Sequence, residues 1–71
     1  MVNTMLLDEK INQSGLKVDF LISNLGISPT AFYKKKRNEI PFRTAEVYVL
    51  CDLLGINTEQ DKLKVFFEEK V

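Results

Sequence analysis

The sequence predicts an all-α protein, a compact single domain of five short helices. Apolar residues recur at intervals of three and four along most of the chain, which is the spacing that places them on one face of a helix. Glycines and prolines divide this pattern into five blocks. No block alternates between apolar and polar residues for long enough to predict a strand. We therefore expect five helices around one core.

Length and composition fit one small globular domain spanning residues 1–71, because 45% of the residues are hydrophobic and 28% are charged. One cysteine excludes an intrachain disulfide, and without any histidine a zinc site is not expected. We expect no metal and no cofactor. No apolar run reaches the length of a membrane span, and residues 1–10 lack a signal-peptide pattern. The expected location is therefore the cytoplasm, without membrane contact.

The first two helices are predicted over residues 4–13 and from about residue 17 to Gly26. In the first, Leu7 and Ile11 lie one turn apart, and a Ser-Gly pair follows as an end signal. Gly26 is suited to the left-handed conformation that ends many helices. The apolar face of the second helix consists of Val18, Leu21, Ile22 and Leu25.

The third helix has the clearest start signal of the chain. Ser28 can cap a free backbone N–H, and Pro29 suits the first helical position, where no N–H donor is needed. The helix is predicted to run to about Arg37 and to give way to an irregular segment over residues 38–41. Its last residues are four consecutive cations, which complement the negative end of the helix dipole.

The fourth helix is predicted over residues 44–54, with Gly55 after it and Glu46 in its first turn. It is apolar around most of its circumference, which indicates that other helices or a partner chain surround it. Cys51 within it is expected to be a small buried hydrophobe. The fifth helix is predicted to begin at residue 57 or 58, with residue 60 or 61 completing a capping box. Its buried stripe is expected to contain Leu63, Phe66 and Phe67.

Charge is distributed unevenly along a chain whose net charge is zero. Residues 28–43 hold five cations and one anion, whereas residues 44–71 hold six anions and three cations. This segregation predicts one basic and one acidic face, of which the basic one suits phosphate. A run of cations at a helix end is also common as a solvated terminus, and alone it favours DNA contact no more than that alternative.

The turn of about three residues between the second and third helices has the spacing of a helix-turn-helix. Its most specific part is Leu25-Gly26-Ile27-Ser28, followed by Phe32-Tyr33-Lys34-Lys35. On these residues the chain resembles the Cro/repressor-type (XRE-like) family of small phage and bacterial transcriptional regulators. The resemblance covers residues 6–67 and implies a lambda-repressor-like fold with the helix-turn-helix at about residues 18–37. In that family Gly26 would form the turn. The residues that would lock the two helices together are Leu21, Leu25, Ile27 and Phe32.

The resemblance implies a sequence-specific regulator that binds an operator in double-stranded DNA and acts by occupying it, in the cytoplasm of a bacterium or of a phage-infected host. No small-molecule ligand is expected. Base reading would fall to Ser28, Thr30, Tyr33 and Lys34. Phosphate anchoring would fall to Lys17, Lys35, Lys36, Arg37 and Arg43. Tyr33 fits equally well at the rim of the core.

The chain departs from the family pattern at two places. Ile22 stands where a small residue usually lies between the two helices, and Lys36-Arg37-Asn38 replaces the aliphatic residue and glycine turn that often follow the recognition helix. These departures leave the placement of the third helix open.

Specific binding by so small a module favours a homodimer, at least on DNA, reading two half-sites. The candidate dimer contacts are Tyr48, Val49, Leu53, Phe66 and Phe67. An alternative is a protein-interaction module on the same scaffold, such as an antirepressor or an antitoxin-like partner binder, which the neutral net charge and acidic second half favour. An enzyme is not expected, because no catalytic constellation is recognisable in the sequence.

Overall fold

The computed structural model describes residues 1–68, which form five helices and contain no strand. The helices are α1 (Thr4–Ser14), α2 (Val18–Leu25), α3 (Pro29–Lys36), α4 (Thr44–Leu54) and α5 (Glu59–Phe66). The all-α class and the five predicted helices are confirmed, and the fourth helix has the predicted ends. The Cα atoms have a radius of gyration of 11.1 Å, the value expected for a compact globule of this length.

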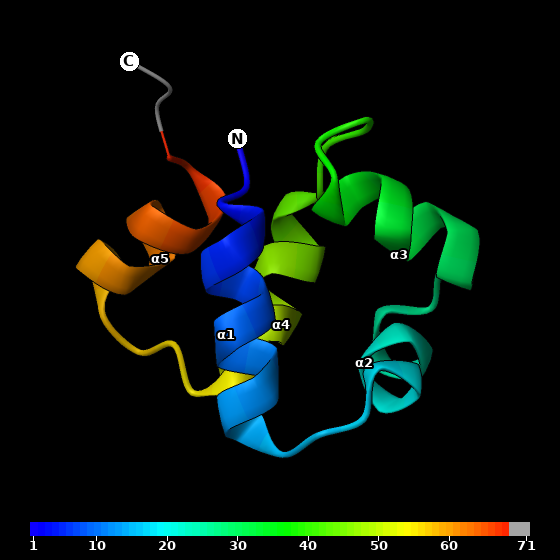
Figure 1. Ribbon diagram of the computed structural model, residues 1–71, viewed down its shortest axis with the longest axis horizontal. Coiled ribbons are helices and arrows are strands. Elements are labelled where there is room, and N and C mark those ends of the chain that lie inside the picture. Colours follow the sequence, from blue (N-terminus) through cyan, green and yellow to red (C-terminus); the bar gives the residue numbers. More distant parts are fainter. Residues whose placement is uncertain (69–71) are drawn as a thin grey trace.

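Helices α1 and α4 connect the rest of the fold. Helix α1 contacts both α4 and α5, while α2 contacts α4 and α3. Figure 1 shows α1 at the centre of the view with α5 on one side and the α2–α3 pair on the other. As a result α3 lies at the edge of the molecule, followed by an extended loop over residues 37–43 that leads into α4. No helix within residues 1–68 is long and apolar enough to cross a membrane.

The core draws a fully buried side chain from each of the five helices. These residues are Leu7, Leu21, Phe32, Leu50 and Val65. Cys51 is buried beside them, as predicted. Ile22 of α2, which is larger than the residue expected between the second and third helices, is also buried in this core. One continuous cluster therefore joins α2 and α3 to the rest of the domain.

The expected buried stripe of the fifth helix is wrong in two of its three residues. Phe66 is buried, but Leu63 is half exposed and Phe67 is 56% exposed. The inward residues are instead Val65 and Phe66, because the start of the chain covers this face: the Asn3 N–H donates to the Val65 carbonyl at 2.8 Å. Phe67 lies beyond the helix end, with φ −130°, so the helical spacing no longer sets its direction.

Candidate nucleic-acid interface

The connection between α2 and α3 consists of residues 26–28. Gly26 has φ 69° and donates its N–H to the carbonyls of Ile22 and Ser23, which closes α2. The Ser28 Oγ accepts a hydrogen bond from the Ala31 N–H at 3.1 Å, so Ser28 is the N-cap of α3. Pro29 occupies the first turn. The turn and cap predicted from the sequence are therefore both present.

Helix α3 turns only one narrow face inward, with Phe32 and Lys35 as its buried residues. The four expected base-reading residues all lie outside this face and are exposed: Ser28, Thr30, Tyr33 and Lys34. They come from the start and the outer side of a single helix at the edge of the domain (Figure 1). Hydroxyl, phenol and ammonium groups are thus displayed together on one surface.

Tyr33 lies at the border between this surface and the core. Its ring meets the edge of the Phe32 ring at a centroid distance of 5.5 Å and an interplanar angle of 79°. The Lys36 ammonium lies 5.3 Å from the Tyr33 ring centroid, within cation–π range. Tyr33 is therefore a rim residue that is still accessible from outside, and the two roles expected for it are compatible.

The five expected anchoring cations do not share one environment. Lys17, Arg37 and Arg43 are exposed, at the start of α2, after α3 and before α4 respectively. Arg37 has an ion pair of 2.6 Å with Glu39. The Lys36 ammonium lies 2.7 Å from the Asp8 carboxylate of α1, and its side chain is only 16% exposed. Lys36 is therefore the least accessible of these four.

Lys35 is buried, which removes it from the expected phosphate contacts. Only 7% of the residue is exposed, and its ammonium lies 2.5 Å from Oε1 of Glu46 in α4. The physical reason is helical spacing: residues three apart share a face, and Lys35 follows the core residue Phe32 by three. Because Lys35 lies in a run of four consecutive cations, nothing in the sequence distinguished it as a buried residue. Glu46, one of two acidic residues in a largely apolar helix, was the available signal for its partner.

The Glu46 carboxylate has two donors. Besides Lys35, the Arg43 N–H donates to the same oxygen at 2.9 Å, which caps the start of α4. Burial acts to raise the pKa of Glu46, but the hydrogen bonds from Lys35 and the Arg43 N–H, with the positive charges of both residues, outweigh it and lower the pKa. Glu46 is therefore an ionised, buried residue at the contact between α3 and α4.

Asn38 is a second residue whose role the sequence did not reveal. It adopts φ 66°, the left-handed conformation usually filled by glycine. Its side chain accepts from the Val2 N–H at 2.7 Å and donates to the Val2 carbonyl at 2.9 Å. The available signal was the identity of the residue, because asparagine tolerates this conformation better than most. Asn38 therefore fills, directly after the end of α3, a left-handed position that glycine usually takes.

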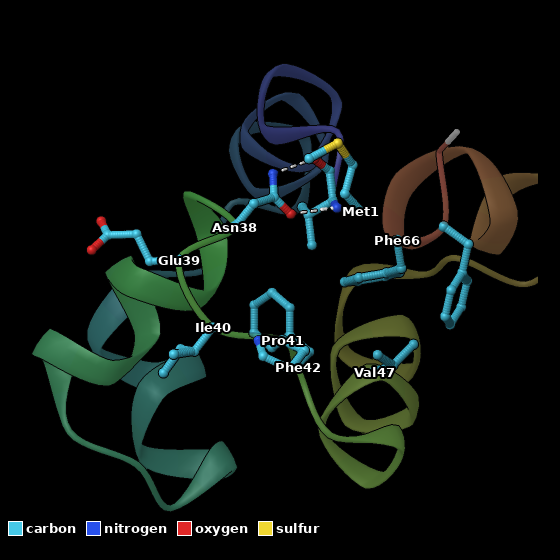
Figure 2. A pocket seen from close by; sticks show the side chains of 10 residues that line it. Met1, Asn38, Glu39, Ile40, Pro41, Phe42, Val47 and Phe66 are labelled. Atoms are coloured by element: carbon cyan, nitrogen blue, oxygen red, sulfur yellow. Dashed lines mark hydrogen bonds between the residues drawn. The ribbon is translucent and has the colours of Figure 1, made fainter. Parts of the chain in front are cut away.

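Cys51, the one cysteine of the chain, is buried in the core. Burial raises the pKa of the Cys51 thiol, against a smaller opposing effect of Lys62, so the thiolate is disfavoured. Within residues 1–68 no group of three or more acidic, histidine or cysteine side chains could hold a metal ion. A hollow of about 310 Å³ lies apart from the expected base-reading residues, between the loop after α3 and the end of α5 (Figure 2). Its walls are largely apolar, with Ile40, Pro41, Phe42 and Phe66 among them.

The expected dimer contacts are only partly available. Tyr48 and Phe67 are exposed, while Val49 and Leu53 are half buried. Phe66 is only 4% exposed, as expected for the buried stripe of the fifth helix, and its ring packs against Phe42 with centroids 5.9 Å apart, so it offers little surface to a partner. Comparison with protein-family models, with curated proteins and with solved structures finds no match.

Proposed function

We propose that the protein is a sequence-specific DNA-binding transcriptional regulator whose α2–turn–α3 unit is a helix-turn-helix. The observation that carries the proposal is the outer face of α3, which presents Ser28, Thr30, Tyr33 and Lys34 together at the edge of the domain. A helix of this kind fits the major groove, where hydroxyl and ammonium groups can pair with base edges.

Exposed cations around α3 support the proposal. Lys17 precedes α2, Arg37 follows α3 and Arg43 precedes α4, so each is an exposed cation at the end of α3 or of a helix next to it in the sequence. Such residues suit phosphate oxygens and would fix the helix in the groove. Lys36 can add to them only by leaving Asp8. Binding would then act by occupancy, because a protein on the operator excludes polymerase or a competing regulator.

A homodimer is part of the same proposal. Two hollows on the surface share Val47 and Phe67 as walls, and one is bordered by Met1 and Ile40, the other by Tyr48 and Leu63. Five of the eight large hydrophobic residues that are exposed within residues 1–68 therefore border these hollows, including Phe67 between them. Phe67 is exposed beside both hollows, which suits a two-fold symmetric dimer: the Phe67 side chain of each copy would fill a hollow of the other copy.

Sedimentation tests the dimer. We expect the wild-type protein to sediment as a dimer at micromolar concentration on DNA, and Phe67→Glu to remain monomeric. Phe20→Glu is the matched control, because Phe20 is also exposed but lines neither hollow. A wild-type protein that stays monomeric with and without DNA contradicts this part of the proposal.

The protein-interaction module remains the second candidate, favoured by the zero net charge and by the apolar hollow beside the loop after α3. Charge reversal separates the two functions. Lys34→Glu combined with Arg43→Glu should weaken binding to duplex DNA at least about tenfold, since each lost cation reduces the number of counterions that the DNA releases on binding. Lys64→Glu, an exposed cation of α5, is the matched control and should change it little. Unchanged DNA binding by the double variant would favour the interaction module.

A further inference from the structure

The two charged residues buried within residues 1–68 are each other's partners, Lys35 and Glu46. Their side chains are each 9% exposed and join the end of α3 to the first turn of α4. No buried side-chain nitrogen or oxygen in the described chain lacks a hydrogen-bond partner, and this holds for the buried atoms of the pair. A buried ion pair at this position requires an explanation, because the other buried residues of α3 and α4 are apolar.

Stability alone does not explain the pair. Removing two charges from water costs several kcal/mol per ion, and well-packed apolar residues of similar volume often give equal or greater stability. Unlike an apolar contact, an ion pair fixes the position of one side chain relative to the other. The ammonium is held at one oxygen, 2.5 Å away, whereas apolar side chains can slide past one another.

Phe32 is the one buried apolar residue of α3, and the packing of one apolar side chain does not fix how far the helix turns about its own axis. Thr4 of α1 holds the last residue of the helix through its bond to the Lys36 carbonyl at 2.6 Å. Lys35, nearly one turn after Phe32, adds a directional contact with α4. Its partner oxygen on Glu46 also accepts from the Arg43 N–H at 2.9 Å, so the oxygen belongs to the capped start of α4.

We infer that Glu46 is a positioning residue for DNA recognition: through Lys35 it sets the angle at which α3 presents its outer face to the groove. This inference rests on the proposed function. Glu46 is buried and would touch no DNA, and it acts only through the placement of the helix. The contact makes base reading depend on a residue outside the DNA-binding surface.

A neighbouring ion pair provides the matched control. Lys36, the next residue of α3, pairs with Asp8 of α1 at 2.7 Å, but the Asp8 side chain is 46% exposed. Water competes for such a pair, so it constrains the helix weakly. Thr4 of α1 also donates to the Lys36 carbonyl at 2.6 Å, and this bond is unaffected by changes at Asp8.

The test compares Lys35→Met/Glu46→Gln with Asp8→Asn, Lys35→Arg and the wild type. The glutamine side chain of the double variant retains an oxygen for the Arg43 N–H, so this variant should melt close to the wild type. We expect its α3 amides to exchange about tenfold faster relative to α1 amides. Its preference for a selected DNA site over random duplex should fall about tenfold. Its affinity for random duplex should change less than about threefold, because a buried lysine contacts no phosphate.

The two control variants should behave like the wild type. Asp8→Asn should leave amide exchange and DNA preference within about threefold of the wild type. Lys35→Arg retains the ion pair and should retain the preference. If the double variant does not fold, Glu46→Asp, which withdraws the carboxylate by one methylene group, carries the same expectation.

Unchanged α3 exchange, or an unchanged DNA preference, overturns the inference. So does a loss of both affinities in proportion to the melting temperature, which is what a purely structural role predicts. If the wild type binds no DNA at all, the proposed function fails. The inferred placement of α3 is then decided by amide exchange alone.

Discussion

The Asn38 side chain pairs with the backbone of Val2 through two hydrogen bonds, of 2.7 and 2.9 Å (Figure 2). This contact ties the residues that follow α3 to the start of the chain. Asn3, the next residue, donates its N–H to the Val65 carbonyl of α5. The start of the chain therefore bridges α3 and α5, which lie on opposite sides of α1 in Figure 1.

Asn38→Ala should lower the free energy of unfolding by about 2 kcal/mol, because two hydrogen bonds are lost and alanine is strained at positive φ. Asn38→Gly should lower it less, since glycine adopts φ 66° freely. Urea denaturation measures both. Asn24→Ala removes an exposed side-chain bond to the Phe20 carbonyl and is the control, with an expected change below about 0.5 kcal/mol. Equal losses for all three variants would contradict the role given to Asn38.

The lowered pKa of Glu46 makes stability depend on pH in a defined direction. A carboxylate whose pKa is lower in the folded state stabilises the fold fully above its ordinary pKa of 4.5, and this contribution is lost as the pH falls through the folded-state pKa. The urea midpoint of the wild type should therefore fall more between pH 7 and pH 3 than that of Lys35→Met/Glu46→Gln. Parallel pH profiles would show that the pair does not contribute as described.

Cys51 should be unreactive in the folded protein, because the thiol is buried and burial raises its pKa. A thiol reagent that gives a coloured product at pH 8 should react on the order of a hundredfold more slowly than in denaturing urea. The protein unfolded in urea is its own control. Equal rates in both solvents would place the cysteine at the surface.

Reading and anchoring residues should differ in their effects on DNA binding. Thr30→Ala or Lys34→Ala should cost roughly 1–3 kcal/mol on the selected site and relax its base preference there. Arg43→Ala should weaken binding equally on all sequences and lower the salt slope by about one. Binding assays on selected and random duplexes at several salt concentrations measure both effects. If all three variants behave alike on both duplexes, the division between reading and anchoring is wrong.

Most of the fold could be predicted from signals between residues that are close in the sequence. Ser28 and Pro29 marked the start of α3 because capping depends on neighbouring residues alone, and Gly26 marked the preceding turn for the same reason. The five helices and the buried Cys51 followed from apolar spacing. These features need no knowledge of which helices meet.

What the sequence did not reveal depends on contacts between distant segments. Lys35 looked like a surface cation until Glu46 of α4 was found opposite it. Phe67 looked like core until α5 was found to end at Phe66. The two bonds between Asn38 and Val2 join residues 36 positions apart, and no local pattern encodes such a pair.

The central claim is that the outer face of α3 reads DNA sequence, and selection from a pool of random duplexes at two salt concentrations tests it most directly. The account predicts that one sequence motif is enriched at both concentrations, and that Thr30→Ala loses enrichment at part of that motif while overall binding weakens with salt. Recovery of unenriched random sequences by the wild-type protein, or no bound DNA at either concentration, would contradict it.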